Sequence, residues 1–225
     1  DMDQLAKRIP ISLKLAGFSI ILTIVFGVGS GVLMAVKKDR LLDHVLGTFS
    51  TAALSVPGFW IAIVLIFLFA EQWKLLPSSG IPGGSGFILP AVTLALPSIG
   101  VCARLTRSAI LDEIGRQYMT VADAKGMSRR HAVICHAFGN ALIPIITYLG
   151  NHMAGIIGGA SIVETIFAIP GIGSYAIAGV QSKDYYVVQA YVLFSGCIYV
   201  LTNILIDLIY IALDPKIRAG EAVES

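Results

Sequence analysis

The sequence has 225 residues, of which 56% are hydrophobic and 13% are charged, and its formal net charge at pH 7 is +2. Soluble domains carry about 25% charged residues, so a soluble chain of this length could not bury so much apolar surface. The net charge is small and no basic stripe is present, which argues against nucleic-acid binding. Cys102, Cys135 and Cys197 are far apart and form no C-x-x-C pair, so neither a disulfide framework nor a metal site is predicted.

Several apolar stretches are long enough to cross a membrane, which takes about 20 mostly apolar residues in a helix. The five that qualify are residues 11–36, 45–69, 87–102 with a polar continuation to 114, 141–167 and 187–213. The third has the shortest apolar run, and Pro90 and Pro97 are expected to kink it. We therefore predict an all-α polytopic membrane protein with about five transmembrane helices, which form a single transmembrane domain over residues 1–225.

The basic residues predict the orientation of these spans. If the spans alternate in direction, eleven of the 16 Lys and Arg residues fall on one side of the membrane. Cytoplasmic loops are enriched in Lys and Arg, so this side is predicted to be cytoplasmic. Lys7, Arg8 and Lys14 then lie outside, against the rule, and a further span before residue 1 would fit the same topology.

Two pairs of glycines recur at four-residue spacing within predicted spans. Gly27 and Gly31 lie in the first span, and Gly155 and Gly159 lie in the fourth. Such spacing allows membrane helices to approach closely. Glycine is also common in membrane helices without this role, and the sequence leaves both interpretations open.

The longest polar segment, residues 112–140, lies between the third and fourth spans on the predicted cytoplasmic side. Residues 119–125 predict a short helix that ends at Gly126, a residue suited to a left-handed C-cap. Ser128 is a candidate N-cap for a second helix that runs into the fourth span. A helix, a glycine turn and a helix would form a compact cytoplasmic projection over residues 119–130, and a projection of this kind suggests a partner protein that receives it.

The stretch "ADAKGMSRRHAVICHAFGNALIPIIT" resembles the cytoplasmic coupling loop, or EAA region, of permeases of binding-protein-dependent ABC importers. The resemblance is to the dipeptide/oligopeptide/nickel permease family, and to the first of its two subunit types, apparently without the N-terminal transmembrane helix. It extends over nearly the whole chain through "LSVPGFWIAIVLI", "ILPAVTLAL", "GGASIVETIFAIPGIG", "DYYVVQ" and "ALDPKIR". Thr120 stands where the general EAA pattern has an acid, and Tyr186 stands where the family has proline.

The resemblance implies a permease subunit in the bacterial plasma (inner) membrane, half of a translocation pathway for short peptides or for nickel and metal chelates. It implies a second permease subunit as heterodimer partner, two cytoplasmic ABC ATPases, an extracytoplasmic solute-binding protein and surrounding lipid. The sequence lacks G-x-x-x-x-G-K-[ST], so the chain is expected to hold no cofactor and to be no enzyme, with ATP and Mg on the partner ATPases. The residues expected to couple to the ATPases are Thr120, Val121, Ala122, Asp123, Ala124, Lys125, Gly126 and Arg129.

Five polar residues in or near the spans are candidates for the translocation path or a gate. Buried polar groups in membrane helices usually face a cavity or a neighbouring helix. Asn151 and His152 lie near the middle of the fourth span, where a hydrogen bond to another helix is the alternative to a path role. Glu164 lies at its outer end, as part of a gate or as a structural cap on the next helix. Asn203 and Asp207 share one face of the last span, for transport or for helix packing.

Other functional classes find less support in the sequence. Motifs for hydrolysis such as H-E-x-x-H and G-x-S-x-G are absent, and the four histidines do not form a ligand cluster by spacing. A self-sufficient channel or secondary carrier remains the main alternative. Secondary carriers often contain an inverted repeat, and no convincing repeat is found here. A membrane anchor without transport would leave the polar residues within the spans unexplained.

Overall fold

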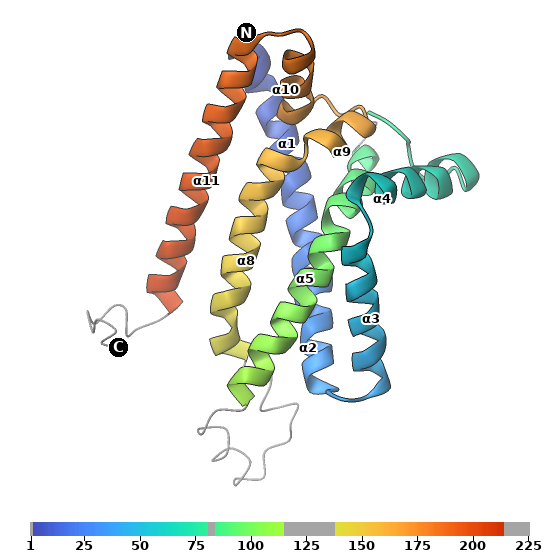
Figure 1. Ribbon diagram of the computed structural model, residues 1–225, viewed down its shortest axis with the longest axis vertical. Helices are drawn as coiled ribbons and strands as arrows, with labels where there is room; N and C mark the ends of the chain where they lie inside the picture. The colour runs from blue at the N-terminus through green and yellow to red at the C-terminus, as the bar shows by residue number, and fades with distance from the viewer. Residues whose placement is uncertain (1, 81–83, 115–137, 214–225) are drawn as a thin grey trace.

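The computed structural model describes residues 2–80, 84–114 and 138–213, and all regular secondary structure among them is helical. In chain order the elements are α1 (Met2–Leu22), η1 (Thr23–Val28), α2 (Gly29–Val36), α3 (Leu41–Ser55), α4 (Gly58–Leu65), η2 (Ile66–Gln72), η3 (Ser85–Phe87), α5 (Ile88–Ile114), α8 (Phe138–Gly159), α9 (Ser161–Ile166), α10 (Ile172–Gln181) and α11 (Tyr185–Leu213). The predicted all-α class is confirmed. Figure 1 shows the long helices running side by side, with α9 and α10 gathered at the upper end.

Helix α5 forms the centre of the bundle. It packs against α1, η1, α2, α3 and α8, whereas α11 packs against α8 and α10 (Figure 1). Burial follows this order, because 61% of the most apolar part of the α5 span is buried but only 11% of that of α11. Exposed leucine, isoleucine, valine and phenylalanine side chains cover the outside of most helices. A bundle that is apolar on its outside as well as its inside is suited to lipid.

Three helical stretches among the described residues are long and apolar enough to cross a membrane: Gln4–Val36, Ser85–Ile114 and Tyr185–Ala212. They confirm the first, third and fifth predicted spans. The apolar part of α8, Ala141–Ile156, covers only the first part of the fourth predicted span, residues 141–167, because α8 ends at Gly159 and α9 follows as a separate short helix. The ends of α2, α5 and α11 and the starts of α3 and α8 lie together at the lower end in Figure 1, which is the alternation that the charge pattern predicts for the cytoplasmic side.

The second predicted span, residues 45–69, is wrong as one continuous helix. Helix α3 ends at Ser55, and Leu41–Ser55 and Gly58–Gln72 meet at an angle of 102°. The cause is local, because Pro57 disfavours helical geometry in the residue before it, and Val56 is extended with φ −93° and ψ 126°. The new helix then begins after Pro57, whose carbonyl accepts hydrogen bonds from the N–H groups of Trp60 and Ile61.

The third predicted span is a full-length helix that contains both prolines. Helix α5 is continuous for 27 residues and includes Pro97. Pro90 lies in its first turn, where a backbone N–H has no intrahelical acceptor and its loss costs little. Pro97 lies inside the helix and is partly buried.

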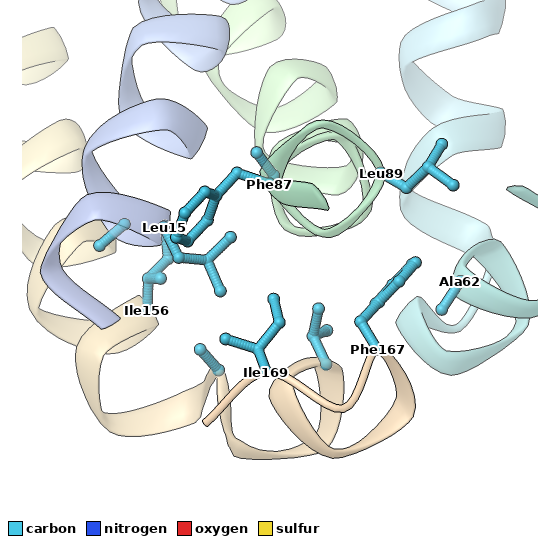
Figure 2. Packing of buried hydrophobic residues seen from close by; sticks show 11 residues of the cluster. Leu15, Ala62, Phe87, Leu89, Ile156, Phe167 and Ile169 are labelled. Atoms are coloured by element: carbon cyan, nitrogen blue, oxygen red, sulfur yellow. The ribbon is translucent and has the colours of Figure 1, made fainter. Parts of the chain in front are cut away.

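The main apolar core lies at the end of the bundle away from the α2–α3 turn. Figure 2 shows Leu15 of α1, Phe87 and Leu89 beside the start of α5, and Ile156 of α8 converging with Phe167 and Ile169 from the turn after α9. All six side chains are buried. A second, smaller cluster of Ala35, Ile110, Ala141 and Ile145 lies nearer the other end of the bundle. The two clusters fix the first helical stretch against α5 and α8 at both ends.

The two glycine pairs predicted from the sequence differ in their surroundings. A Cβ atom on Gly27 would lie 2.8 Å from Cβ of Cys102, and one on Gly31 would lie 2.6 Å from the carbonyl oxygen of Ala103. Both glycines therefore permit the contact between the first helical stretch and α5. Gly155 has open space where its Cβ would be, so the same spacing serves no close contact there.

We expect Gly31→Ala to lower stability by about 1–3 kcal/mol, because the added methyl meets a backbone oxygen that cannot move without shifting α5. Gly29→Ala is the matched control, since nothing lies within 4 Å of its Cβ position and alanine is the better helix former. The thermal midpoint in detergent, followed by size-exclusion chromatography, should fall for the first variant and hold or rise for the second. Equal midpoints for the two variants would contradict the packing argument.

Candidate functional site

The predicted coupling residues, Thr120 to Gly126 and Arg129, lie outside the described residues. Their two attachment points are described, because α5 ends at Ile114 and α8 begins at Phe138. Both points lie at the same end of the bundle as the α2–α3 turn (Figure 1). That turn carries Lys37, Lys38 and Arg40, all of which are exposed. The segment therefore leaves and re-enters the bundle on the predicted cytoplasmic side.

Glu164 is completely buried at the opposite end, on α9. Its Oε1 accepts a hydrogen bond from the hydroxyl of Ser12 at 2.5 Å, and its Oε2 accepts one from the backbone N–H of Ser174 at 2.8 Å. The Ser12 oxygen in turn accepts the backbone N–H of Ile172 at 2.9 Å. The first N–H groups of a helix have no intrahelical acceptors and carry partial positive charge, so Glu164 and Ser12 together cap α10 from two other helices.

A hollow of about 330 Å³ lies beside this cap, lined by Glu164 and Ser174 together with residues of α9 and α10. Gly171 leaves room for the carboxylate, because a Cβ atom there would collide with it. All bonding positions described for the carboxylate are directed into the protein, toward Ser12 and Ser174. This geometry favours the structural cap over the external gate among the two roles considered for Glu164.

His152 contacts its neighbours through one side of its ring. Nδ1 lies 3.3 Å from Oγ of Ser98 on α5, and the ring stacks on that of Tyr148 with centroids 5.8 Å apart. The Tyr148 hydroxyl donates to the backbone carbonyl of Ser98, so the three residues join α8 to α5. Asn151, the adjacent residue, is exposed. The histidine has the inter-helix contact that the packing alternative requires.

Asn203 and Asp207 lie on α11, which is mostly exposed. The Asn203 amide donates to the carbonyl of Tyr199 in its own helix at 2.8 Å, and Asp207 is exposed. One turn from Asp207, the Tyr210 hydroxyl is hydrogen bonded to Thr147 of α8. The five candidate path residues thus come from α8, α9 and α11 and do not form one cluster.

The sequence analysis missed the strongest polar contact of the bundle. Arg107 of α5 donates from Nε and Nη2 to the two carboxylate oxygens of Asp43 on α3, both at 2.7 Å. Asp43 is 4% exposed, and it also accepts the backbone N–H of Asp39 at 3.0 Å. Both residues were assigned to polar segments next to the spans. Their pairing across 64 positions leaves no local signal in the sequence.

A large groove opens beside this ion pair. It has a volume of about 1220 Å³ and lies between α3 and α5, with polar groups of both helices along it. Its lining includes Asp43, His44, Thr48, Thr51 and Ser55 of the α3 side and Arg104, Arg107 and Ser108 of the α5 side. Among the described residues, no group of three or more His, Cys, Asp or Glu side chains is arranged to hold a metal ion.

The comparisons with known proteins agree with this architecture. Residues 27–219 match the family of the binding-protein-dependent transport system inner membrane component. A probable peptide ABC transporter permease protein, y4tP, of Sinorhizobium fredii is 38% identical over 96% of this chain and 72% of its own length. The dipeptide transport system permease protein DppB of Bacillus subtilis is 34% identical over 96% of this chain and 70% of its own length.

One further relative and one solved structure are also similar to this chain. The glutathione transport system permease protein GsiC of Escherichia coli K12 is 33% identical over 96% of this chain and 71% of its length. Among solved structures, the MetNI methionine ABC transporter in an inward-facing conformation has a chain with a TM-score of 0.78, at 17% identity, over 95% of this chain and 97% of that one. The chain therefore belongs to the family of binding-protein-dependent transport system inner membrane components, as a permease subunit of an ABC importer in the inner membrane.

Proposed function

We propose that this permease subunit carries short peptides. The observation that carries the proposal is the identity of 33–38% over at least 95% of the chain to permeases named for peptides, dipeptides or glutathione. Nickel and metal chelates, the other solutes considered from the sequence, appear in the name of none of these four relatives. Membership of the importer family also disfavours the self-sufficient channel or carrier.

In this proposal, other chains supply the remaining parts of the transporter. A second permease subunit completes the translocation pathway, an extracytoplasmic protein delivers the solute, and two cytoplasmic ATPases bind and hydrolyse ATP with Mg. This chain forms one transmembrane domain over residues 1–225, holds no cofactor and catalyses no reaction itself. Thr120 to Gly126 and Arg129 contact an ATPase, in support of which both attachment points of the segment lie at the basic end of the bundle (Figure 1).

Uptake measurements test the solute. In cells that lack only this subunit, uptake of a labelled dipeptide is expected to be lost and to return when the gene is supplied, whereas uptake of nickel is expected to be unchanged by either step. Restoration of nickel uptake without dipeptide uptake would overturn the peptide assignment and leave the family assignment intact.

Gly126→Trp supplies the transport-inactive control for the same cells. An indole at this position is expected to block the ATPase contact, because a bulky residue is excluded from a left-handed turn or from the partner's surface. The variant should reach the membrane in normal amounts and restore less than about a tenth of the uptake, a loss of at least about 1.4 kcal/mol in coupling. Normal uptake by this variant would contradict the assignment of the coupling segment.

A further inference from the structure

The groove between α3 and α5 is lined by polar side chains of both helices together with apolar ones, among them Met34, Val101 and Leu105. On α3 its lining includes His44, Thr48, Thr51 and Ser55. These residues are spaced by four, three and four positions, which places them on one side of a helix. All four are exposed. The polar stripe therefore runs along the whole length of α3 rather than being confined to its cytoplasmic end.

The adjoining face of the same helix is apolar, and His44 and Thr48 also line a second hollow, of about 480 Å³, together with apolar residues of that face. Leu41, Val45 and Phe49 follow one another at four-residue spacing and are 79%, 56% and 56% exposed. Helix α3 thus presents one face suited to lipid and one suited to water. The hydroxyls of Thr51 and Ser55 donate to carbonyls of their own helix, which leaves their oxygen lone pairs able to accept from water or from a solute.

The α5 side of the groove contributes positive charge. Arg107 is neutralised by Asp43 through two hydrogen bonds, but Arg104, which is exposed, has no acidic partner among the described residues. Arg104 lies ten residues before the end of α5, about 15 Å along the helix. The apolar run of this helix covers residues 87–102, so Arg104 lies just beyond it, toward the predicted cytoplasmic side, where a charged side chain is usually directed to a cavity or to water.

We propose that the α3–α5 groove is this chain's share of the water-filled solute path, and that Arg104 binds the carboxylate of a peptide that passes along it. The proposal rests on the proposed function for the chemical class of the solute. A guanidinium presents a planar fork that matches a carboxylate with two parallel hydrogen bonds. With Arg107 already paired to Asp43, Arg104 is the guanidinium of the groove that remains for a solute.

An anionic lipid fits the groove less well. Its headgroup would take the basic end near His44, and its acyl chains would then lie against Thr48, Thr51 and Ser55, since Ser55 is 14 residues beyond Leu41, or about 21 Å along the helix. Acyl chains make no hydrogen bonds to hydroxyls, and the apolar face through Val45 and Phe49 would suit them better. A helix of another subunit would have to supply an acid for Arg104.

Thiol accessibility tests the groove without reference to the solute. In the assembled transporter, with Cys102, Cys135 and Cys197 replaced by alanine, the Thr51→Cys and Ser55→Cys variants are compared with Phe49→Cys, which lies on the apolar face and does not line the groove. In inside-out vesicles, a charged, membrane-impermeant thiol reagent is expected to react with the first two at least tenfold faster. Equal slow reaction at all three positions would mean that lipid or another subunit covers the groove, and would overturn the proposal.

Protection of the Thr51→Cys variant tests Arg104. Dipeptide added directly to the vesicles should slow the thiol reaction at a concentration at least tenfold lower than the same dipeptide with an amidated carboxyl terminus. Arg104→Gln should abolish this difference, Arg104→Lys should retain part of it, and Arg40→Gln, which changes an arginine outside the groove, should leave it unchanged. Persistence of the preference in Arg104→Gln would overturn the role of Arg104.

The experiments distinguish failure of the proposed peptide function from failure of the proposed carboxylate site. If cells with the unaltered subunit take up no peptide, the proposed function fails, while the thiol reaction rates still report whether the groove holds water. If peptide is taken up but the dipeptide and its amide protect equally, the carboxylate site is wrong and the peptide function stands.

Discussion

Replacing Asp43 by alanine is expected to leave little folded protein in the membrane. The substitution removes both acceptors of the Arg107 guanidinium, whose two bonds at 2.7 Å join α3 to α5. Removing one partner of a buried ion pair costs about 3–5 kcal/mol, because the remaining charge is left without compensation. Arg107 keeps 30% of its side chain exposed, so we expect the lower end of that range, about 3 kcal/mol. Detergent-solubilised protein should show a thermal midpoint lower by about 6 °C or more.

Two further variants identify the cause. Asp112→Ala removes an exposed acid elsewhere on α5 and should change the midpoint little. The double variant Asp43→Leu, Arg107→Met removes both charges and should recover most of the loss, since an apolar pair of similar volume often replaces a buried ion pair without cost. If the double variant is as unstable as Asp43→Ala, the Asp39 backbone contact rather than the ion pair maintains the turn.

Glu164→Ala is expected to release α10 from the bundle. The backbone N–H of Ser174 loses its acceptor and the Ser12 hydroxyl loses the group to which it donates. Each bond to a charged group contributes about 1.5–3 kcal/mol, so we expect a local loss of about 3 kcal/mol or more. Protease added to the outer side should then cleave within residues 170–184 at least tenfold faster than in the unaltered protein. Local opening of this kind precedes global unfolding.

Thr165→Ala is the matched control, because the neighbouring Thr165 is exposed and its hydroxyl donates only to the carbonyl of Ser161 among the contacts described. Its cleavage rate should not change. Glu164→Gln should give an intermediate rate, since one amide oxygen can still accept from Ser174 while the negative charge at the start of α10 is lost. Unchanged cleavage in Glu164→Ala would show that α10 is held by its apolar contacts alone.

Hydropathy predicts most of the fold because lipid imposes a simple rule, that a spanning segment be long, apolar and helical. The rule succeeds for residues 11–36 and 187–213, which lie within single long spans. It fails at Val56 and Pro57, where the apolar run continues but the backbone turns through 102°. A hydropathy average over a window of residues does not register the effect of a single proline on the backbone. At Pro97, by contrast, helix α5 continues and the span is the one that hydropathy predicts.

The polar contacts were less accessible from the sequence, because each depends on residues far apart in the chain. Glu164 could be recognised as a candidate cap for the next helix, but its partner Ser12 is 152 positions away. The pair of Asp43 and Arg107 is similar. Spacing does reveal the stripe of His44, Thr48, Thr51 and Ser55, and a helical wheel of residues 41–55 could have found it. Mean hydropathy averages over all residues of a span and so does not separate the two faces of that helix.

The low burial of α11 affects how long the subunit survives in the cell. With 11% of its most apolar stretch buried and Asp207 exposed on it, this helix leaves most of its apolar surface uncovered by the rest of the chain. A copy synthesised in excess over the other subunits would be held at this helix by little more than the contacts to α8 and α10. Membrane proteases degrade unassembled subunits of this kind. The amount of this subunit in the cell should therefore depend on the amount of its partner subunits rather than on the strength of its own promoter.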